Sequence, residues 1–229
     1  MDFQLKKHIP NAITCCNLMS GCAATGAAFY GHYHWAVVMI VVGAVFDFFD
    51  GLTARALGVS SPIGKELDSL ADVVTFGVAP SAIVFQHLCS LHQHVWFMPF
   101  AAFVMAAFSA LRLAKFNLDE RQTTSFIGLP TPANALFWGS LVVGFGEQLS
   151  ATPYYIYIVL ALVLLSSYLL VAELPLFALK FKHWGWRGNE VKYIFVATSV
   201  LILALLQVRG IAVVIAWYVL LSVVASKKI

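Results

Sequence analysis

The sequence contains few charged residues and no long polar stretch. Only 11% of its 229 residues are charged, whereas 61% are hydrophobic and the mean hydropathy is +0.85. Soluble domains seldom show such an apolar excess. The longest polar stretches, around 114–126 and 180–192, are too short to fold alone. The composition therefore argues against a separate soluble domain, and we expect one integral membrane domain over residues 1–229.

Cysteines are also scarce, and their positions argue against a metal site or a disulfide framework. The four are Cys15, Cys16, Cys22 and Cys89. They show no metal-ligand spacing, and three lie in apolar runs, where cysteine behaves as a small hydrophobic residue. A cleavable signal peptide is not expected either, because the apolar run after Lys6 and Lys7 is too long for a signal core. We expect that run to be retained as the first membrane span.

Apolar runs of about 20 residues indicate transmembrane helices. The pattern predicts eight helices, at approximately 11–30, 34–57, 65–88, 95–117, 130–148, 152–172, 190–207 and 209–227. The third carries Gly77 and Pro80, so we expect a kink in it. Only the turn Gln207-Val-Arg209-Gly210 separates the last two. The expected fold class is an all-α, polytopic helical membrane bundle.

Basic residues set the expected orientation, because thirteen of the fourteen fall on one side of these spans. They are Lys6, Lys7, Arg55, Lys65, Arg112, Lys115, Arg121, Lys180, Lys182, Arg187, Lys192, Lys227 and Lys228. The positive-inside rule makes that side, with both termini, cytoplasmic. The net charge of +3 then suits anionic lipid headgroups rather than nucleic acid. We expect a multi-pass protein of a bacterial inner (plasma) membrane.

Four aspartates lie where a membrane protein accommodates them least. Asp47 and Asp50 are three residues apart, and Asp68 and Asp72 are four apart, so each pair lies on one helix face. An ionised side chain at membrane depth costs roughly 2.5–3.5 kcal/mol, which makes such residues functional candidates. Crowded carboxylates either protonate or bind cations. Two divalent ions would balance the four charges, and oxygen ligands favour Mg²⁺, Mn²⁺ or Ca²⁺. Such a pair of ions suits phosphoryl transfer.

The residues around the aspartates fit a phosphate-containing ligand. Gly51, Ala54 and Gly64 remove bulk from the helix ends, and Arg55 offers a planar fork for phosphate. Taken singly, the small residues could serve only helix packing, and Arg55 could be only a cytoplasmic anchor. Together they form D-x2-D-G-x2-A-R-x8-G-x3-D-x3-D, which fixes eight residues at set spacing.

This pattern resembles the signature of the CDP-alcohol phosphotransferases. These integral membrane enzymes move a phosphatidyl or similar group from a CDP-linked donor to an alcohol and release CMP. The resemblance implies a six-helix core, here about 8–172 with two extra helices at about 190–227, and a homodimer. It implies that Asp47, Asp50, Asp68 and Asp72 hold two divalent cations on the cytoplasmic side, with Asp72 also the general base. The cations would be Mg²⁺ or Mn²⁺, with Ca²⁺ as an alternative.

The same resemblance implies a CDP-binding site. Its residues would be Asn11, Thr14, Gly51, Ala54, Arg55 and Gly64. The first two belong to Pro10-Asn11-Ala-Ile-Thr14, which is similar to the family's first-helix signature. By itself that segment could be only a helix start.

Three further stretches resemble the phosphatidylserine synthases, a branch of the family. They run from Asp68 to Pro80, from Ser109 to Asn117 and from Phe126 to Ala133. The residue after the third stretch is Asn134, where the resemblance predicts a small residue. The donor would be CDP-diacylglycerol and the acceptor L-serine. The acceptor-site candidates are Arg112, Lys115, Asn117 and Gly128. We expect Arg112 to pair with the serine carboxylate and residues 126–130 to form a loop over the site.

Alternatives stay open for the acceptor site. Arg112 and Lys115 could only anchor their helix at headgroups, and residues 126–130 could be a simple connection. Within the family, the acceptor could instead be glycerol 3-phosphate or an inositol compound, although an acceptor phosphate calls for a denser basic cluster.

Functions outside the family fit less well. A cation or proton transporter would often show internal repeats, but the aspartate pattern has no second copy, and Arg55 would repel a cation. A structural scaffold does not account for the cost of four carboxylates.

Overall fold

The computed structural model is helical throughout most of its length. It describes residues 3–91, 96–118, 126–177, 185–186 and 188–226. The helices are α1 (Phe3–Phe29), α2 (Tyr33–Leu57), α3 (Pro62–Asp72), the π-helix η1 (Val73–Val78), α4 (Ala79–Ser90), the 3₁₀-helix η2 (Met98–Phe103), α5 (Val104–Leu118), α6 (Thr131–Ser150), α7 (Tyr155–Val171), α8 (Glu190–Leu206) and α9 (Val208–Ser226). Since α3–η1–α4 and η2–α5 are continuous, the described residues form eight helical rods. The predicted all-α class is confirmed.

Five helical segments are long and apolar enough to cross a membrane within the described part of the chain. They are His8–Phe29, Tyr33–Leu57, Pro62–Ser90, Met98–Leu118 and Val208–Ala225, and Tyr155–Val171 is a shorter apolar helix. A helix of about 20 apolar residues matches the hydrocarbon thickness of a bilayer. The protein is therefore a multi-pass membrane protein, as the apolar runs predict.

The first helix begins earlier than expected. It starts at Phe3 and contains Pro10, whereas the sequence pattern places its start near residue 11. Proline often marks the first turn of a helix, which is why the segment suggested a helix start. Inside a helix, proline removes one backbone hydrogen bond. The other bonds of the helix remain, so the helix extends eight residues further toward the N-terminus.

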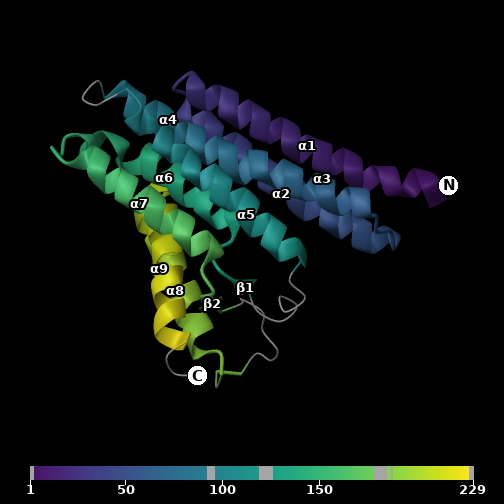
Figure 1. Ribbon diagram of the computed structural model, residues 1–229. Coiled ribbons are helices and arrows are strands. Elements are labelled where there is room, and N and C mark those ends of the chain that lie inside the picture. The colour runs from purple at the N-terminus through teal and green to yellow at the C-terminus, as the bar shows by residue number, and fades with distance from the viewer. Residues whose placement is uncertain (1–2, 92–95, 119–125, 178–184, 187, 227–229) are drawn as a thin grey trace.

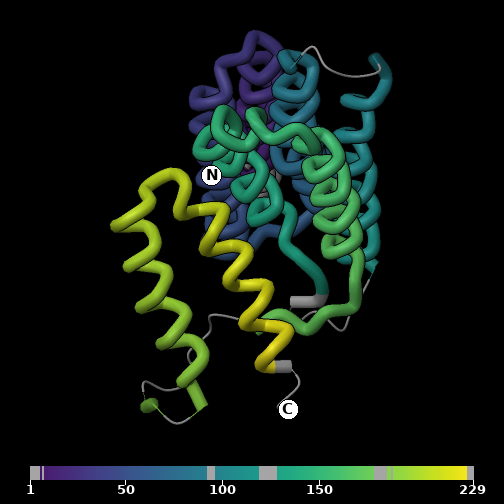
Figure 2. Tube along the Cα trace, turned by 90° about the vertical axis from the view of Figure 1, so that its left-hand side faces the viewer, coloured from purple at the N-terminus to yellow at the C-terminus, as the bar shows by residue number. Residues whose placement is uncertain are grey.

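The helices on either side of the aspartates form the main bundle (Figure 1). Helices α1 and α2 pack along their lengths, and the α3–η1–α4 rod packs against α1. Trp138 of α6 and Ile83 of α4 are fully buried in the apolar core. Helices α8 and α9 form a hairpin that lies beside the bundle (Figure 2), and α9 packs on α6. The predicted turn between them is present, with Gln207 at a φ of 50°.

A short ladder ties the start of α6 to the end of α7. Strand β1 (Phe126–Ile127) pairs antiparallel with β2 (Pro175–Leu176), a small addition to the all-helical expectation. The backbone N–H of Gly128 donates to the Leu174 carbonyl at 3.0 Å. Gly128 has a φ of +77°, and a Cβ there would lie 2.7 Å from the Leu170 carbonyl oxygen. Only glycine fits this position without strain.

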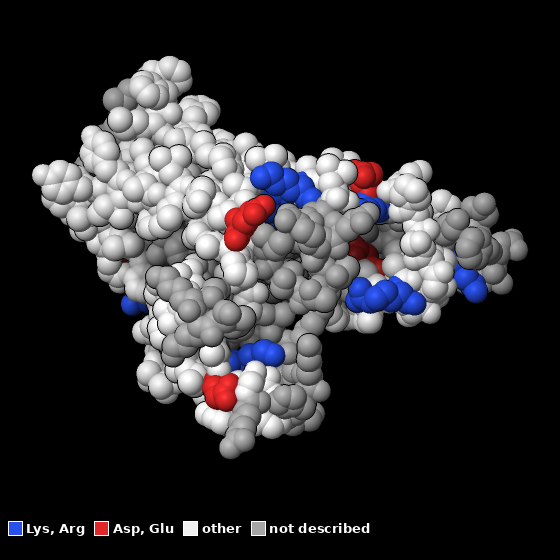
Figure 3. All heavy atoms as spheres, turned by 60° about the horizontal axis from the view of Figure 1, so that its bottom comes forward, with Lys and Arg blue, Asp and Glu red and all other residues white. Residues whose placement is uncertain are grey.

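On the face shown in Figure 3, the charged side chains of the described residues form a few patches among uncharged ones. This distribution agrees with a protein that is surrounded by lipid. Some of the basic residues used to predict the orientation lie outside the described residues. They are Arg121, Lys180, Lys182, Arg187, Lys227 and Lys228. All four cysteines are free thiols.

Candidate active site

The turn between α2 and α3 brings the two aspartate pairs together. Gly58 directly follows α2, and its left-handed φ of 62° lets its N–H cap the helix. Ser61 directly precedes α3, and its Oγ accepts a hydrogen bond from the Gly64 N–H at 3.0 Å. The chain reverses within this short turn. Asp50, eight residues before Gly58, therefore lies at about the level of Asp68, seven residues after Ser61.

Three of the four aspartates converge. Asp47, Asp50 and Asp68 each offer a carboxylate oxygen, and these oxygens lie within 4.8 Å of one another. Asp50 is buried, and Oδ1 of Asp68 is buried with no hydrogen-bond partner among the described residues. An all-carboxylate set with an unpartnered oxygen fits a hard divalent cation, because Mg²⁺, Mn²⁺ and Ca²⁺ prefer oxygen ligands.

Asp72 lies one turn further along α3, outside that group of three. It is 8% exposed, and its Oδ1 accepts a hydrogen bond of 3.1 Å from Nδ2 of Asn17 on α1. It also interacts electrostatically with Arg112 of α5. Asp72 is thus placed between the three carboxylates and the half-buried Arg112.

Asn17 is a site residue that the sequence reasoning missed. It is fully buried, and its backbone carbonyl accepts a hydrogen bond from Oγ1 of Thr75 at 3.0 Å. A Cβ on Gly43 of α2 would lie 2.9 Å from Asn17 Oδ1. The absence of that Cβ lets α1 and α2 approach closely enough to hold the amide against Asp72. Asn17 follows Thr14 by three residues and so lies on the same face of α1, and this spacing could have predicted it as a site residue.

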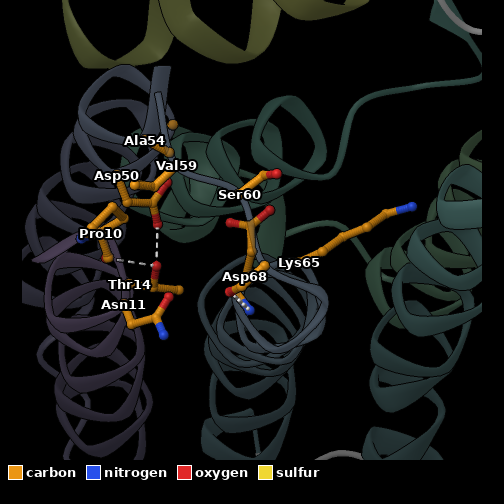
Figure 4. Close-up of a pocket in the computed structure, with 12 residues that line it drawn as sticks. Pro10, Asn11, Thr14, Asp50, Ala54, Val59, Ser60, Lys65 and Asp68 are labelled. Atoms are coloured by element: carbon orange, nitrogen blue, oxygen red, sulfur yellow. Dashed lines mark hydrogen bonds between the residues drawn. The ribbon is translucent and has the colours of Figure 1, made fainter. Parts of the chain in front are cut away.

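A pocket opens beside the aspartates, between α1, α2 and α3 (Figure 4). Its lining residues are Pro10, Asn11, Thr14, Asp50, Gly51, Ala54, Val59, Ser60, Ser61, Gly64, Lys65 and Asp68. Five of the six residues expected to bind CDP are among them. The sixth, Arg55, is exposed on α2, and its Nη1 lies 3.4 Å from where a Cβ on Gly51 would be. Arg55 therefore extends over Gly51 at the pocket's edge.

Helix α1 contributes one wall of this pocket and a direct contact with the carboxylates. The hydroxyl of Thr14 lies 2.6 Å from Oδ2 of Asp50 and 3.1 Å from the Pro10 carbonyl (Figure 4). A Cβ on Gly64 would lie 3.0 Å from Oδ1 of Asn11. The first-helix segment and the aspartate pattern, which are far apart in sequence, thus form one site.

The remaining acceptor candidates lie in different surroundings. The Arg112 side chain is half-buried, with Nη1 3.5 Å from Oγ1 of Thr131 and Nε without a described partner. Lys115 is exposed. Asn117 links α5 to α3, because its Nδ2 donates to Ser69 Oγ at 2.8 Å.

The backbone of α5 makes a second link to α3. The carbonyl of Asn117 accepts a 2.8 Å hydrogen bond from Nζ of Lys65, whose side chain points away from the pocket (Figure 4).

Gly128, the last of the acceptor candidates, packs on the last carbonyls of α7. Among the four candidates, the structure shows only Arg112 interacting with an aspartate of the site, and a role in acceptor binding stays a prediction for all of them.

A π-helical segment follows Asp72 directly. Where the sequence predicts a kink, η1 spans Val73–Val78 and ends just before Pro80. Pi-helical insertions occur frequently at functional sites. A Cβ on Gly77 would lie 3.0 Å from the Cβ of Ser109, so η1 and α5 are in close contact here.

Known proteins match much of the chain. The family described as CDP-alcohol phosphatidyltransferase matches residues 7–179. A relative from Bacillus subtilis, 40% identical over 125 residues, is named CDP-diacylglycerol–serine O-phosphatidyltransferase. Proteins of the same name from Helicobacter pylori and Mycobacterium leprae are 36% and 33% identical over 129 and 135 residues.

These matches differ in how much of each relative they cover. They span 55%, 56% and 56% of this chain, and 70%, 54% and 44% of the Bacillus, Helicobacter and Mycobacterium relatives respectively. The family match itself covers well over half of the chain and includes all four aspartates and the α1 wall of the pocket. The chain belongs to the CDP-alcohol phosphatidyltransferase family.

Proposed function

We propose that the protein transfers the phosphatidyl group of CDP-diacylglycerol to the hydroxyl of L-serine, giving phosphatidylserine and CMP. The observation that carries the proposal is the convergence of three carboxylates, two of which (Asp50 and Asp68) line a pocket between α1, α2 and α3. The names of the relatives support serine as the acceptor.

The donor is assigned to the pocket. The small residues Gly51, Ala54 and Gly64 leave room there for a ligand to approach the backbone, and Asn11 offers an amide side chain. Arg55 at the edge of the pocket supplies the fixed positive charge that a diphosphate needs. The diacylglycerol chains would extend from this site into the bilayer.

The aspartates are assigned to a pair of divalent cations, Mg²⁺ or Mn²⁺. The proposed ligands are the three converging carboxylates of Asp47, Asp50 and Asp68, with Asp72 as the fourth. The cations, when bound, would neutralise the diphosphate and polarise its oxygens. Thr14 fixes the orientation of Asp50 through its 2.6 Å hydrogen bond.

Transfer is proposed as a direct displacement. The serine hydroxyl gives its proton to Asp72 as its oxygen forms a bond to the lipid-linked phosphorus, and the bond from that phosphorus to the CMP oxygen breaks. Arg55 stabilises the charge that develops on the departing CMP. Asn17 holds Oδ1 of Asp72, which leaves the other carboxylate oxygen to accept the proton.

The site is proposed to face the cytoplasm of a bacterial plasma membrane. The described basic residues near it, among them Arg55, Lys65, Arg112 and Lys115, lie at the same helix ends as the aspartates. The positive-inside rule supports that side as cytoplasmic. The homodimer that the family resemblance implies is carried forward as a proposal.

The decisive experiment is a CMP-release assay on purified protein in detergent with CDP-diacylglycerol. L-serine, glycerol 3-phosphate and inositol are supplied in parallel, with Mg²⁺ or Mn²⁺ present or removed by a chelator. We expect release with serine alone and only when a divalent ion is present. Release that does not depend on serine, or a preference for another acceptor, would overturn the assignment.

A further inference from the structure

Helices α5 and α6, which both pack against η1, carry fully buried polar side chains that have no hydrogen-bond partner among the described residues. On α6, Asn134 is 0% exposed, and neither its Oδ1 nor its Nδ2 is bonded. On α5, Ser109 is also 0% exposed, and its Oγ has no hydrogen-bond partner. Arg112 is half-buried, but its Nε is buried and unpaired as well. Buried polar groups are nearly always paired, so unpaired ones ask for an explanation such as an unseen ligand.

One of these side chains, Arg112, interacts electrostatically with Asp72, and the others lie one helical turn from Arg112 or from its contact Thr131. The 3.5 Å approach of Arg112 Nη1 to Thr131 Oγ1 places α5 beside the start of α6. Helix α5 ends, and α6 begins, on the side of β1, so the two helices run in opposite directions there. Ser109 lies one turn before Arg112 and Asn134 one turn after Thr131. Ser109 and Asn134 therefore both lie about one helical turn further from the β1 end of their helices than the Arg112–Thr131 contact.

The aspartate helix reaches the same depth. Gly77, five residues after Asp72, would carry a Cβ 3.0 Å from the Cβ of Ser109. The π-helix η1 also packs against α6. None of the residues that carry the unpaired groups lines the donor pocket.

The chemistry of these groups matches a small zwitterion. Arg112 can bind a carboxylate through its guanidinium. An ammonium group needs an acceptor, and the Oδ1 of a carboxamide is a neutral acceptor that can be buried without a charge. Glycerol 3-phosphate and inositol carry no cation to place against that oxygen.

We infer that Asn134 recognises the ammonium group of the acceptor through Oδ1, one turn deeper than the arginine that binds its carboxylate. The inference rests on the proposed function, because it takes serine as the acceptor. Asn134 stands where the resemblance to phosphatidylserine synthases predicts a small residue, so this contact would be a feature of this chain rather than of those synthases. Asn134 is in this view a specificity-determining residue of this chain.

The test compares two acceptors in wild-type protein and in Asn134→Ala. The acceptors are L-serine and 3-hydroxypropionate, which has the hydroxyl and carboxylate of serine but no amine. Losing a hydrogen bond to a charged group should raise KM for serine by about 10- to 100-fold. The kcat/KM for 3-hydroxypropionate should stay unchanged, so the preference for serine shrinks.

A matched control separates recognition from packing. Ser140→Ala changes another buried polar residue of α6, whose hydroxyl is bonded to carbonyls of its own helix, and should leave both acceptors unaffected. Without substrate, Asn134→Ala should unfold at the wild-type temperature or above, because it removes two unpaired buried atoms. A lower unfolding temperature with an equal loss for both acceptors would show that Asn134 is structural and would overturn the inference.

The outcomes distinguish this inference from the proposed function. If the wild-type protein releases no CMP with serine, the proposed function fails. If it does, and Asn134→Ala keeps the wild-type KM for serine, only the inference is wrong. The wild-type comparison needs no variant: equal kcat/KM for serine and 3-hydroxypropionate overturns the inference even where Asn134→Ala fails to fold.

Discussion

Asn17 on α1 donates a hydrogen bond from Nδ2 to Oδ1 of Asp72 on α3, across 3.1 Å. Both residues are buried, the amide oxygen of Asn17 packs against Gly43, and Thr75 Oγ1 donates to the Asn17 backbone carbonyl. The bond fixes which carboxylate oxygen of Asp72 is engaged and which remains available. A residue of the first helix thereby sets the geometry of the proposed base.

Removing this amide should slow the reaction more than it weakens binding. Asn17→Ala leaves Asp72 without its donor, and we expect kcat to fall about tenfold or more, since hydrogen bonds to charged groups are the strong ones. The KM for CDP-diacylglycerol should change little. Steady-state CMP release measures both. Ser20→Ala, on the same helix and bonded only to the Cys16 carbonyl, serves as the control. A change in KM with kcat intact would contradict the positioning role.

Asp72→Asn should nearly abolish transfer while the fold is kept. The asparagine has the same shape and can still accept the Asn17 hydrogen bond through Oδ1, but it cannot take the serine proton. A positioned base contributes about 10²- to 10⁴-fold, so kcat should fall by that range. Circular dichroism and thermal unfolding should match the wild type. A variant with the full rate would rule out Asp72 as the base.

Thr14→Val should weaken metal binding. The hydroxyl of Thr14 lies 2.6 Å from Asp50 Oδ2, and valine keeps the shape of the side chain without the donor. Residues that orient metal ligands typically contribute about 10- to 100-fold in metal affinity, so the Mn²⁺ concentration for half-maximal activity should rise by that factor. Thr25→Val, whose hydroxyl bonds the Gly21 carbonyl within the same helix, should leave it unchanged. The same Mn²⁺ dependence in both variants would contradict the prediction.

Gly64→Ala should impair the donor pocket. The added Cβ would lie 3.0 Å from both Asn11 Oδ1 and Ser61 Oγ, so the pocket wall must shift. Overpacking of this kind costs about 1–3 kcal/mol, and we expect KM for CDP-diacylglycerol to rise roughly 5- to 100-fold. Gly26→Ala is the matched control, since nothing lies within 4 Å of its Cβ. An unchanged KM would mean that Asn11 can move without affecting the donor.

Arg112→Ala tests the acceptor carboxylate. The guanidinium lies near Asp72 and Thr131 and retains an unpartnered Nε. Losing a charge-assisted pair should raise KM for serine by about 10- to 100-fold. The KM for CDP-diacylglycerol is the internal reference and should change far less. An equal rise in both would remove Arg112 from the acceptor site.

The features that could be predicted from sequence are those with a local period. Apolar runs of membrane length gave the helical rods, and the three- and four-residue spacing of the aspartates placed each pair on one helix face. The start of α1 was misplaced because Pro10 is equally compatible with a first turn and with a helix interior.

Single polar residues could not be interpreted in the same way. Asn17 and Asn134 lie within largely apolar runs and repeat no motif. The hydrogen bond of Asn17 to Asp72 and the unpaired side chain of Asn134 depend on how other helices pack around them. Gly128 appeared to belong to a loop over the site. Its contact with the carbonyls of α7, more than forty residues later, depends on tertiary structure alone.

The π-helical turn after Asp72 has a consequence for how the chain can vary. A π-helix holds its turn with a longer hydrogen-bonded ring than an α-helix, so deleting one residue from 73–78 could restore a continuous α-helix without breaking it. That deletion would rotate the upstream part by about 100° relative to α4, since an α-helix has 3.6 residues per turn. Asp68 and Asp72 would then leave their partners although every side chain of the site was still present. The extra residue in η1 is therefore as necessary to the site as the carboxylates are, because it sets the direction in which Asp68 and Asp72 point.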